Sequence, residues 1–184
     1  MQKTTALTIP VLLLCGALLP AGNSHGQTPN SRAPAWNSIY LEVLGNGGLY
    51  SVNFERKVSD RIALRAGLAS WSASSFFTDE ERSLTVLPLL ASYLQGSGNH
   101  RAEVGAGFLV GRQTIEAAFS NASESSTIVN LTGALGYRYQ RPHGGLVFRA
   151  GFTPFYSLSP SDEDTAYPDK GFFPSVGVSF GYAF

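Results

Sequence analysis

The fold class of this chain is decided by residues 172–184, which read FFPSVGVSFGYAF. From Val176 to Phe184, every second residue is large and apolar, and the residues between them are glycine, serine or alanine. Successive side chains of a β-strand point to opposite faces of the strand. This strand therefore has one apolar face and one face of small or weakly polar groups. Such a strand suits a transmembrane β-barrel, which has lipid outside and a packed polar lumen inside.

Residues 1–26 have the order of a secretory signal peptide. Lys3 precedes an apolar run over 6–19, and small and polar residues follow it. The run is shorter than the roughly 20 residues that a transmembrane helix needs. We therefore expect export, followed by a flexible periplasmic leader over 27–37. The single cysteine, Cys15, lies inside the signal peptide, so the mature chain is expected to lack disulfides and cysteine-based sites.

The charge of the chain argues against nucleic acid as a partner. The sequence balances 13 lysines and arginines against 13 aspartates and glutamates, whereas nucleic-acid binding requires a basic patch. Only 14% of the residues are charged, and 20 are glycine, which is unusual for a water-soluble domain. This composition suits a barrel with an apolar outer surface.

Seven further segments with strand character precede the last one, and turn residues separate them. Their even total matches single-chain bacterial barrels. Residues 38–184 are therefore predicted to form an all-β, eight-stranded antiparallel transmembrane β-barrel with up-and-down order. In one strand, both the odd-numbered and the even-numbered positions are apolar, so the face that points into the barrel cannot be assigned. The predicted strands are 38–45, 49–58, 61–71, 83–95 (the unassigned one), 100–113, 127–140, 144–157 and 172–184.

The connections between these strands alternate in length. Short periplasmic turns and longer extracellular loops are typical of outer-membrane barrels. We therefore expect an outer-membrane protein with both termini in the periplasm. The tight connection 45–48 on the outer side is an exception. The short connections are 59–60, 96–99 and 140–144, and the long ones are 72–82, 114–126 and 158–171.

Several aromatic residues on the apolar parity lie at the strand ends that border the short turns. Aromatic belts at this depth are typical of membrane interfaces. Tyr93 belongs to this set only if its strand is phased with Tyr93 outward. The predicted inner aromatic girdle consists of Phe54, Tyr93, Tyr137, Tyr139, Tyr182 and Phe184.

Three parts of the chain resemble small outer-membrane β-barrel proteins of Bacteroidetes-type bacteria. They are the run LEVLGNGGLYSVNFER (41–56), the run GNHRAEVGAG (98–107) and the phenylalanine-ended last strand. The resemblance covers about 38–184 and implies the architecture but no activity, so it carries over no catalytic residue. Together with the position of the last strand, it implies that the outer-membrane assembly machinery reads Phe180, Tyr182 and Phe184.

Charged residues also occur on the inward parity of several strands. Three acids and three bases in a narrow lumen are expected to pair, because an unpaired buried charge is costly. The pattern therefore predicts a lumen filled by side chains, and a gated or leaky ion path between the charges is the alternative. The predicted lumen charge network consists of Glu42, Glu55, Arg65, Glu103, Arg138 and Arg149.

The sequence holds no recognisable catalytic, cofactor or metal site. His100 and His143 fall in different short turns, and no base accompanies the serines of the loops. The acidic stretches 78–82 and 159–164 could hold divalent cations beside lipopolysaccharide, or they are simply solvated. The expected role is structural or surface-exposed and non-enzymatic, in a monomer whose partners are outer-membrane lipid, lipopolysaccharide and the assembly machinery. The alternatives are a narrow channel or surface receptor that acts through the loops, and a lipid- or lipopolysaccharide-modifying enzyme.

Overall fold

The computed structural model describes residues 33–74, 80–117, 123–158 and 171–184. The predicted signal peptide, most of the predicted leader and the central parts of the three long loops lie outside the described residues. Across the described part of the chain, no helix is long and apolar enough to cross a membrane.

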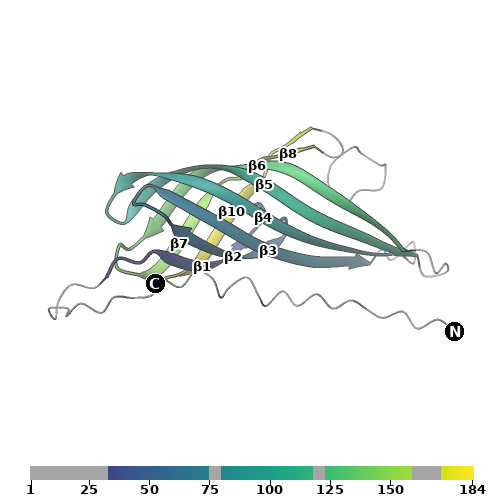
Figure 1. Cartoon of the computed structure of the whole chain (residues 1–184), viewed down its shortest axis with the longest axis horizontal. Helices are drawn as coiled ribbons and strands as arrows, with labels where there is room; N and C mark the ends of the chain where they lie inside the picture. The colour runs from purple at the N-terminus through teal and green to yellow at the C-terminus, as the bar shows by residue number, and fades with distance from the viewer. Residues whose placement is uncertain (1–32, 75–79, 118–122, 159–170) are drawn as a thin grey trace. The chain divides into compact units, whose positions relative to one another are not determined.

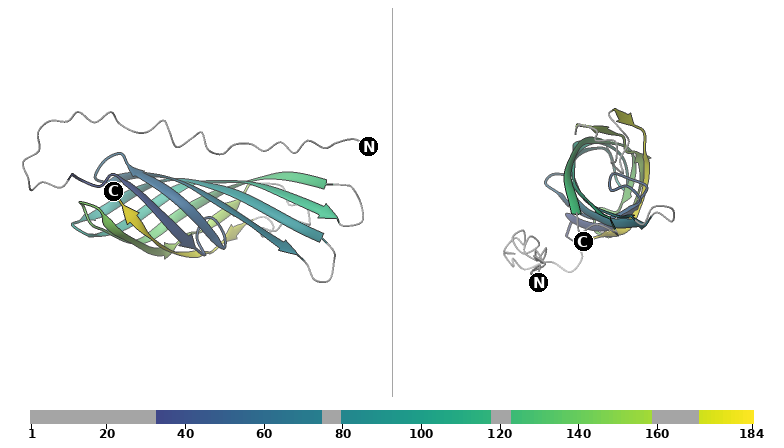
Figure 2. Two further views of the ribbon diagram at one scale, coloured as in Figure 1. Left: turned by 90° about the horizontal axis from the view of Figure 1, so that it is seen from below. Right: turned by 90° about the vertical axis from the view of Figure 1, so that its right-hand side faces the viewer.

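The strands form one closed antiparallel sheet (Figures 1 and 2). From β1 to β7, each strand pairs with the next one in the chain. β10 pairs with β7 and with β1, which closes the ring, and the short strands β8 and β9 extend the sheet beside β6. β7 and β8 together correspond to the predicted strand 144–157, and β9 and β10 together correspond to the predicted strand 172–184. The predicted eight-stranded antiparallel barrel is therefore confirmed. The strands are β1 Asn37–Val43, β2 Tyr50–Lys57, β3 Ile62–Ser74, β4 Glu80–Ser97, β5 His100–Ala117, β6 Ser123–Gln140, β7 Gly145–Phe152, β8 Phe155–Ser157, β9 Phe172–Phe173 and β10 Val176–Ala183.

Two prolines interrupt strands that the sequence predicts to be continuous. Pro154 separates β7 from β8, and Pro174 separates β9 from β10. Proline has no backbone N–H and therefore breaks the ladder of hydrogen bonds. A hydrogen bond of 2.7 Å from the Thr153 N–H to the Ser175 carbonyl joins the two interruptions.

The strands differ greatly in length. β4, β5 and β6 have 18 residues each, whereas β1 has 7 and β2, β7 and β10 have 8. The wall is therefore high on one side and low on the other (Figure 2). The predicted loops 72–82 and 114–126 are too long, since β4, β5 and β6 extend into them. Backbone pairing continues there through polar residues, such as Thr114 opposite Ser125, that the hydrophobic pattern does not mark.

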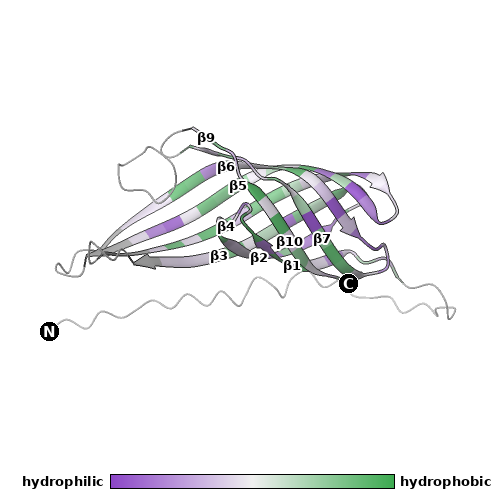
Figure 3. Ribbon diagram, turned by 180° about the vertical axis from the view of Figure 1, so that it is seen from behind, coloured by the Kyte–Doolittle hydropathy of each residue, from purple (hydrophilic) through white to green (hydrophobic). Residues whose placement is uncertain are grey.

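The apolar side chains of the strands lie mainly on the outside of the barrel. The structure also settles the phase of β4, whose Leu87, Leu89 and Tyr93 are exposed while Leu84 and Leu90 are buried in the lumen. Figure 3 shows the alternation of apolar and polar residues along the strands.

Candidate functional site: a charged lumen

The six charged residues singled out from the sequence all point into the lumen. They come from six strands, β1, β2, β3, β5, β6 and β7, and each is at most 6% exposed. Their side chains form ion pairs between strands.

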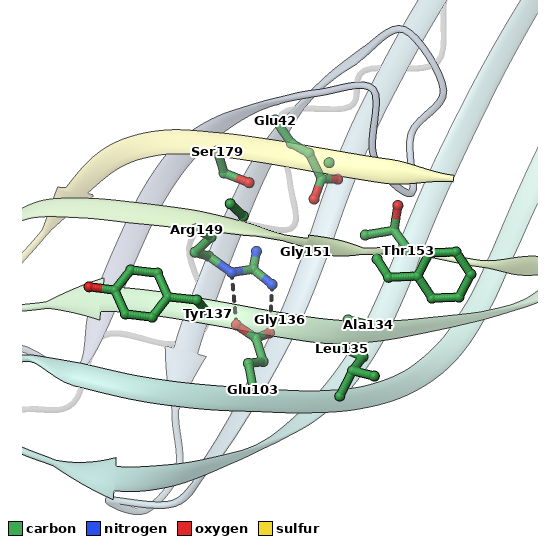
Figure 4. A pocket seen from close by; sticks show the side chains of 13 residues that line it. Glu42, Glu103, Ala134, Leu135, Gly136, Tyr137, Arg149, Gly151, Thr153 and Ser179 are labelled. Carbon is green, nitrogen blue, oxygen red and sulfur yellow. Dashed lines mark hydrogen bonds and ion pairs between the residues drawn. The ribbon is translucent and has the colours of Figure 1, made fainter. Parts of the chain in front are cut away.

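The centre of the cluster is the pair of Arg149 with Glu103. Two hydrogen bonds join them, from Nε of Arg149 to Oε2 at 2.9 Å and from Nη2 to Oε1 at 2.5 Å (Figure 4). The Ser92 hydroxyl donates a third hydrogen bond to this carboxylate, at 2.8 Å. Nη1 of Arg149 donates to the Tyr40 hydroxyl at 2.6 Å, and the guanidinium lies 4.9 Å from the centre of the Tyr40 ring. Every N–H-bearing nitrogen of this arginine is therefore bound.

A second pair, Arg138 with Glu55, is connected to the first. Arg138 Nη2 binds the Glu55 carboxylate, and its Nε donates to Gln140 Oε1 at 2.9 Å. Arg138 lies directly opposite Arg149 in the β6–β7 ladder, an arrangement of like charges that is unfavourable without acids nearby. Glu103 compensates both arginines, because its Oε2 is also 3.8 Å from Nη1 of Arg138.

Two glycines of the wall lie close to this carboxylate and line a small cavity beside it. Gly136 lies opposite Glu103 on β6 and opposite Gly151 on β7. A cavity of about 20 Å³, roughly enough for one water molecule, lies between this glycine pair and the side chains of Glu42, Glu103 and Arg149.

The third ion pair holds the β1–β2 turn inside the barrel. Arg65 Nη1 lies 3.1 Å from Glu42 Oε1, and its Nη2 donates to the side-chain oxygen of Asn46. Asn46 is fully buried, and its side-chain amide donates to the Thr132 hydroxyl and, at 3.0 Å, to the Gly133 carbonyl on β6. The turn between β1 and β2 therefore reaches across the lumen.

Apolar clusters lie above and below the charged region. On the side of the long strands, buried Leu84, Val86, Leu109, Ile128 and Phe155 pack together with Ala69, and Trp71 packs against them. At the short-turn end, Ala35 packs against Val147 and Ala183. The last residues of the predicted flexible leader, 35–37, are thus held against the barrel, and Asn37 already belongs to β1.

Sequence reasoning missed two members of this site. Tyr40 is buried and bridges the two ion pairs, since its hydroxyl also lies 3.4 Å from Glu55 Oε2. Its inward parity in the predicted strand 38–45 was the available signal. Asn46 was assigned to an outer hairpin turn, and nothing local shows that this turn bends inward.

The residues of the predicted aromatic girdle lie on the outside of the barrel near the short turns. Phe54, Tyr93, Tyr137, Tyr182 and Phe184 are exposed, and Tyr139 is half-buried. Phe180, which belongs to the predicted assembly signal, is also exposed on β10. Whether the assembly machinery reads these residues stays a prediction.

The two remaining histidines do not meet. His100 Nδ1 lies 2.6 Å from the Tyr137 hydroxyl, whereas His143 lies in the β6–β7 turn. Within the described ranges, no group of three or more histidines, cysteines and acids is arranged to hold a metal ion.

Comparison with solved structures shows a similar fold in two bacterial proteins. The N-terminal β-barrel domain of Pseudomonas aeruginosa OprF is 19% identical, with a TM-score of 0.55 over 82% of this chain and 99% of that one. Ail, the attachment invasion locus protein of Yersinia pestis, is 12% identical, with a TM-score of 0.50 over 82% and 97% of the two chains. That Ail structure is a complex with the heparin analogue sucrose octasulfate. No protein-family model and no curated protein sequence matches this chain.

Proposed function

We propose that this chain is a monomeric integral outer-membrane barrel with a structural or surface-exposed, non-enzymatic role. The observation that carries the proposal is that charged side chains lie inside and apolar side chains lie outside, the reverse of the arrangement in a water-soluble protein. Six charged side chains are buried in the lumen, while Leu135, Val176 and Phe180 on the outside are more than half exposed. An apolar surface of this extent is stable only against lipid or another protein.

The contents of the lumen favour a plug over a pore. The six buried charges compensate one another, the β1–β2 turn crosses the lumen, and apolar clusters lie on both sides of the charged region. An ion that enters would have to displace these paired groups, and breaking a buried ion pair is costly. The narrow channel is therefore the second candidate.

Planar-bilayer recording tests the plug. The purified protein is expected to give no steady current above that of a protein-free bilayer, whereas a general porin in the same lipid gives open-channel currents. A steady, ion-selective conductance from the wild-type protein would contradict the plugged lumen and favour the narrow channel.

The charge of the outer segments argues against a polyanionic ligand there. Ail has been crystallised with a sulfated heparin analogue. In this chain, the segments 72–82, 112–126 and 158–171 together hold nine acids and three bases, which would repel a sulfated sugar. We propose that this acidic end faces lipopolysaccharide and meets it through divalent cations, which prefer oxygen ligands.

The enzymatic alternative has a direct test. Mass spectrometry of lipid A from a strain that lacks the gene is expected to match that of the parent strain. A lost or added acyl or phosphate group in the deletion strain would favour a modifying enzyme instead.

A further inference from the structure

The charge of the barrel is distributed unevenly along its axis. The strand ends and turns at the short-turn end (56–62, 96–101 and 139–145) hold five basic side chains and one acidic side chain, Asp60. Lys57 is buried, and its Nζ lies 5.5 Å from the centre of the Trp36 ring. The other four, Arg56, Arg61, Arg101 and Arg141, are exposed or half-buried and are named here the arginine collar.

Hydrogen bonds between the short turns hold the collar in place. Arg101 donates to the Asp60 carbonyl of the β2–β3 turn. The Gln140 N–H donates to the Asn99 carbonyl at 2.9 Å, which joins the β4–β5 turn to the β6–β7 turn. The Ala35 N–H donates to the Pro142 carbonyl at 2.8 Å, which joins the β6–β7 turn to the segment before β1. The cations therefore sit on a connected rim and not on independent loops.

The collar is also bound to the aromatic girdle on the outer face. Arg61 Nη1 lies 3.4 Å from the Tyr93 hydroxyl, and Arg141 Nε lies 3.3 Å from the Tyr139 hydroxyl. The same pattern recurs where His100 contacts the Tyr137 hydroxyl. Tyrosines on a lipid-facing surface lie at headgroup depth. Their contacts hold Arg61 and Arg141 at the level of the lipid phosphates.

From this arrangement we propose that the arginine collar binds the phosphate groups of anionic phospholipids in the leaflet at the short-turn end. Guanidinium groups match phosphate geometry, and basic residues near an anionic membrane surface add to binding. The position of the cations against the tyrosines favours lipid over a soluble polyanion. The inference rests on the proposed membrane barrel and adds a ligand class to it.

Trp36 provides a probe at this end of the barrel. Replacing Trp71 with phenylalanine leaves Trp36 as the only tryptophan, since the chain has two. The indole N–H of Trp71 has no hydrogen-bond partner in the described structure, so this exchange removes no hydrogen bond. The single-tryptophan protein is reconstituted in phosphatidylcholine bilayers. One set of bilayers contains brominated phosphatidylglycerol and the other contains brominated phosphatidylcholine, in both cases with the bromine atoms near the headgroup. The ratio of the two quenching curves gives the preference for the anionic lipid.

We expect a preference for phosphatidylglycerol, with each arginine contributing on the order of fivefold. It should fall in about 1 M salt, where screening acts over roughly 3 Å. The triple variant Arg61→Gln, Arg101→Gln and Arg141→Gln should lose most of the preference, since only Arg56 of the collar remains, and the corresponding lysine triple variant should keep it. Arg112→Gln, an exposed arginine towards the opposite end, is the matched control and should leave it unchanged.

Equal quenching by the two lipids in the single-tryptophan protein would overturn the proposal, as would a preference that is undiminished in the glutamine triple variant. Binding of the protein to isolated peptidoglycan without any lipid preference would assign the collar to that polymer instead. Failure of the barrel itself would be seen separately, as loss of heat-modifiable migration on a gel before any lipid is compared.

Discussion

At the scale of single residues, Glu103 determines how the lumen charges are balanced. It lies between two arginines that face each other across the β6–β7 ladder, and it contacts both of them. Within the described residues, the Arg149 guanidinium donates hydrogen bonds to Glu103 and Tyr40, so Glu103 is the acid that balances its charge. Removing one partner leaves the other charged and buried in a place that water reaches poorly.

Arg149→Ala is therefore expected to lower the free energy of unfolding by about 3–5 kcal/mol. Adding Glu103→Gln should restore part of this loss, because it removes the unmatched carboxylate. Urea unfolding in liposomes measures both effects. Arg112→Ala, an exposed arginine outside the lumen, is the control and should change stability by about 0.5 kcal/mol or less.

The same measurement checks the assignment of inner and outer faces. Phe148 precedes Arg149, and its ring packs against the ring of Phe180 on the outer side, with 4.9 Å between the two ring centres. Phe148→Arg should cost about 2–4 kcal/mol, as a charge on the lipid face does near the middle of a bilayer. A Phe148→Arg variant as stable as wild type would contradict the assignment.

At the scale of the elements, the β1–β2 hairpin is too short to cross a membrane alone. A transmembrane strand needs about 9–11 residues, and these two have 7 and 8. Their turn would then lie within the membrane, where its backbone groups need partners in the protein. The Leu44 N–H donates to the Leu49 carbonyl at 3.0 Å, and the Asn46 N–H donates to Glu42 Oε2 at 3.1 Å. Leu44 and Leu49 point outward, and Asn46 points inward.

Asn46→Ala is expected to destabilise the barrel by about 1–3 kcal/mol, because Arg65 and Thr132 lose a buried hydrogen-bond partner. The control is Asn99→Ala in a short turn, where the backbone carbonyl that accepts from Gln140 is retained. Thermal unfolding followed by gel shift compares the two variants. Equal stability of both would show that the inward turn is not held by its side chain.

The glycines of β6 offer a paired test of wall packing. A Cβ at Gly136 would lie 2.7 Å from the Gly151 Cα and would also meet the Ala150 carbonyl, and backbone cannot move aside cheaply. At Gly133 on the same strand, the nearest atom would be 3.5 Å away, an ordinary contact. Gly136→Ala should therefore cost about 1–3 kcal/mol, whereas Gly133→Ala should be tolerated. Urea midpoints in the reverse order would contradict this packing.

At the scale of the whole molecule, the two ends of the barrel differ in charge and in height. The basic, short-turn end carries the girdle, and the opposite end carries the extended ends of β3, β4, β5 and β6, where Glu80, Glu81, Glu116 and Glu124 outnumber Arg82 and Arg112. This polarity supports an orientation with the short turns in the periplasm.

Protease added to intact cells is expected to cut only around 72–82, 114–126 or 158–171. Disrupted cells should show additional cleavage, which controls for access. Cutting at 96–99 or 140–144 in intact cells would reverse the proposed orientation.

The sequence by itself determined the barrel and the two faces of most strands. The period of two is a local property, so Arg149 beside Phe148 already indicates which side faces the lumen. Strand four could not be phased this way, because its inward Leu84, Val86 and Leu90 are as apolar as its outward residues. The reason lies in the apolar cluster of the lumen, which exists only once the barrel is closed.

Only the tertiary structure decided which charges meet. Glu42 and Glu103 are both inward, yet Arg149 pairs with Glu103 while Glu42 pairs with Arg65. The choice depends on the register between strands, which cannot be derived from one strand alone. The same holds for Asn46, since the direction in which a turn bends depends on partners such as Thr132, more than eighty positions away in the chain.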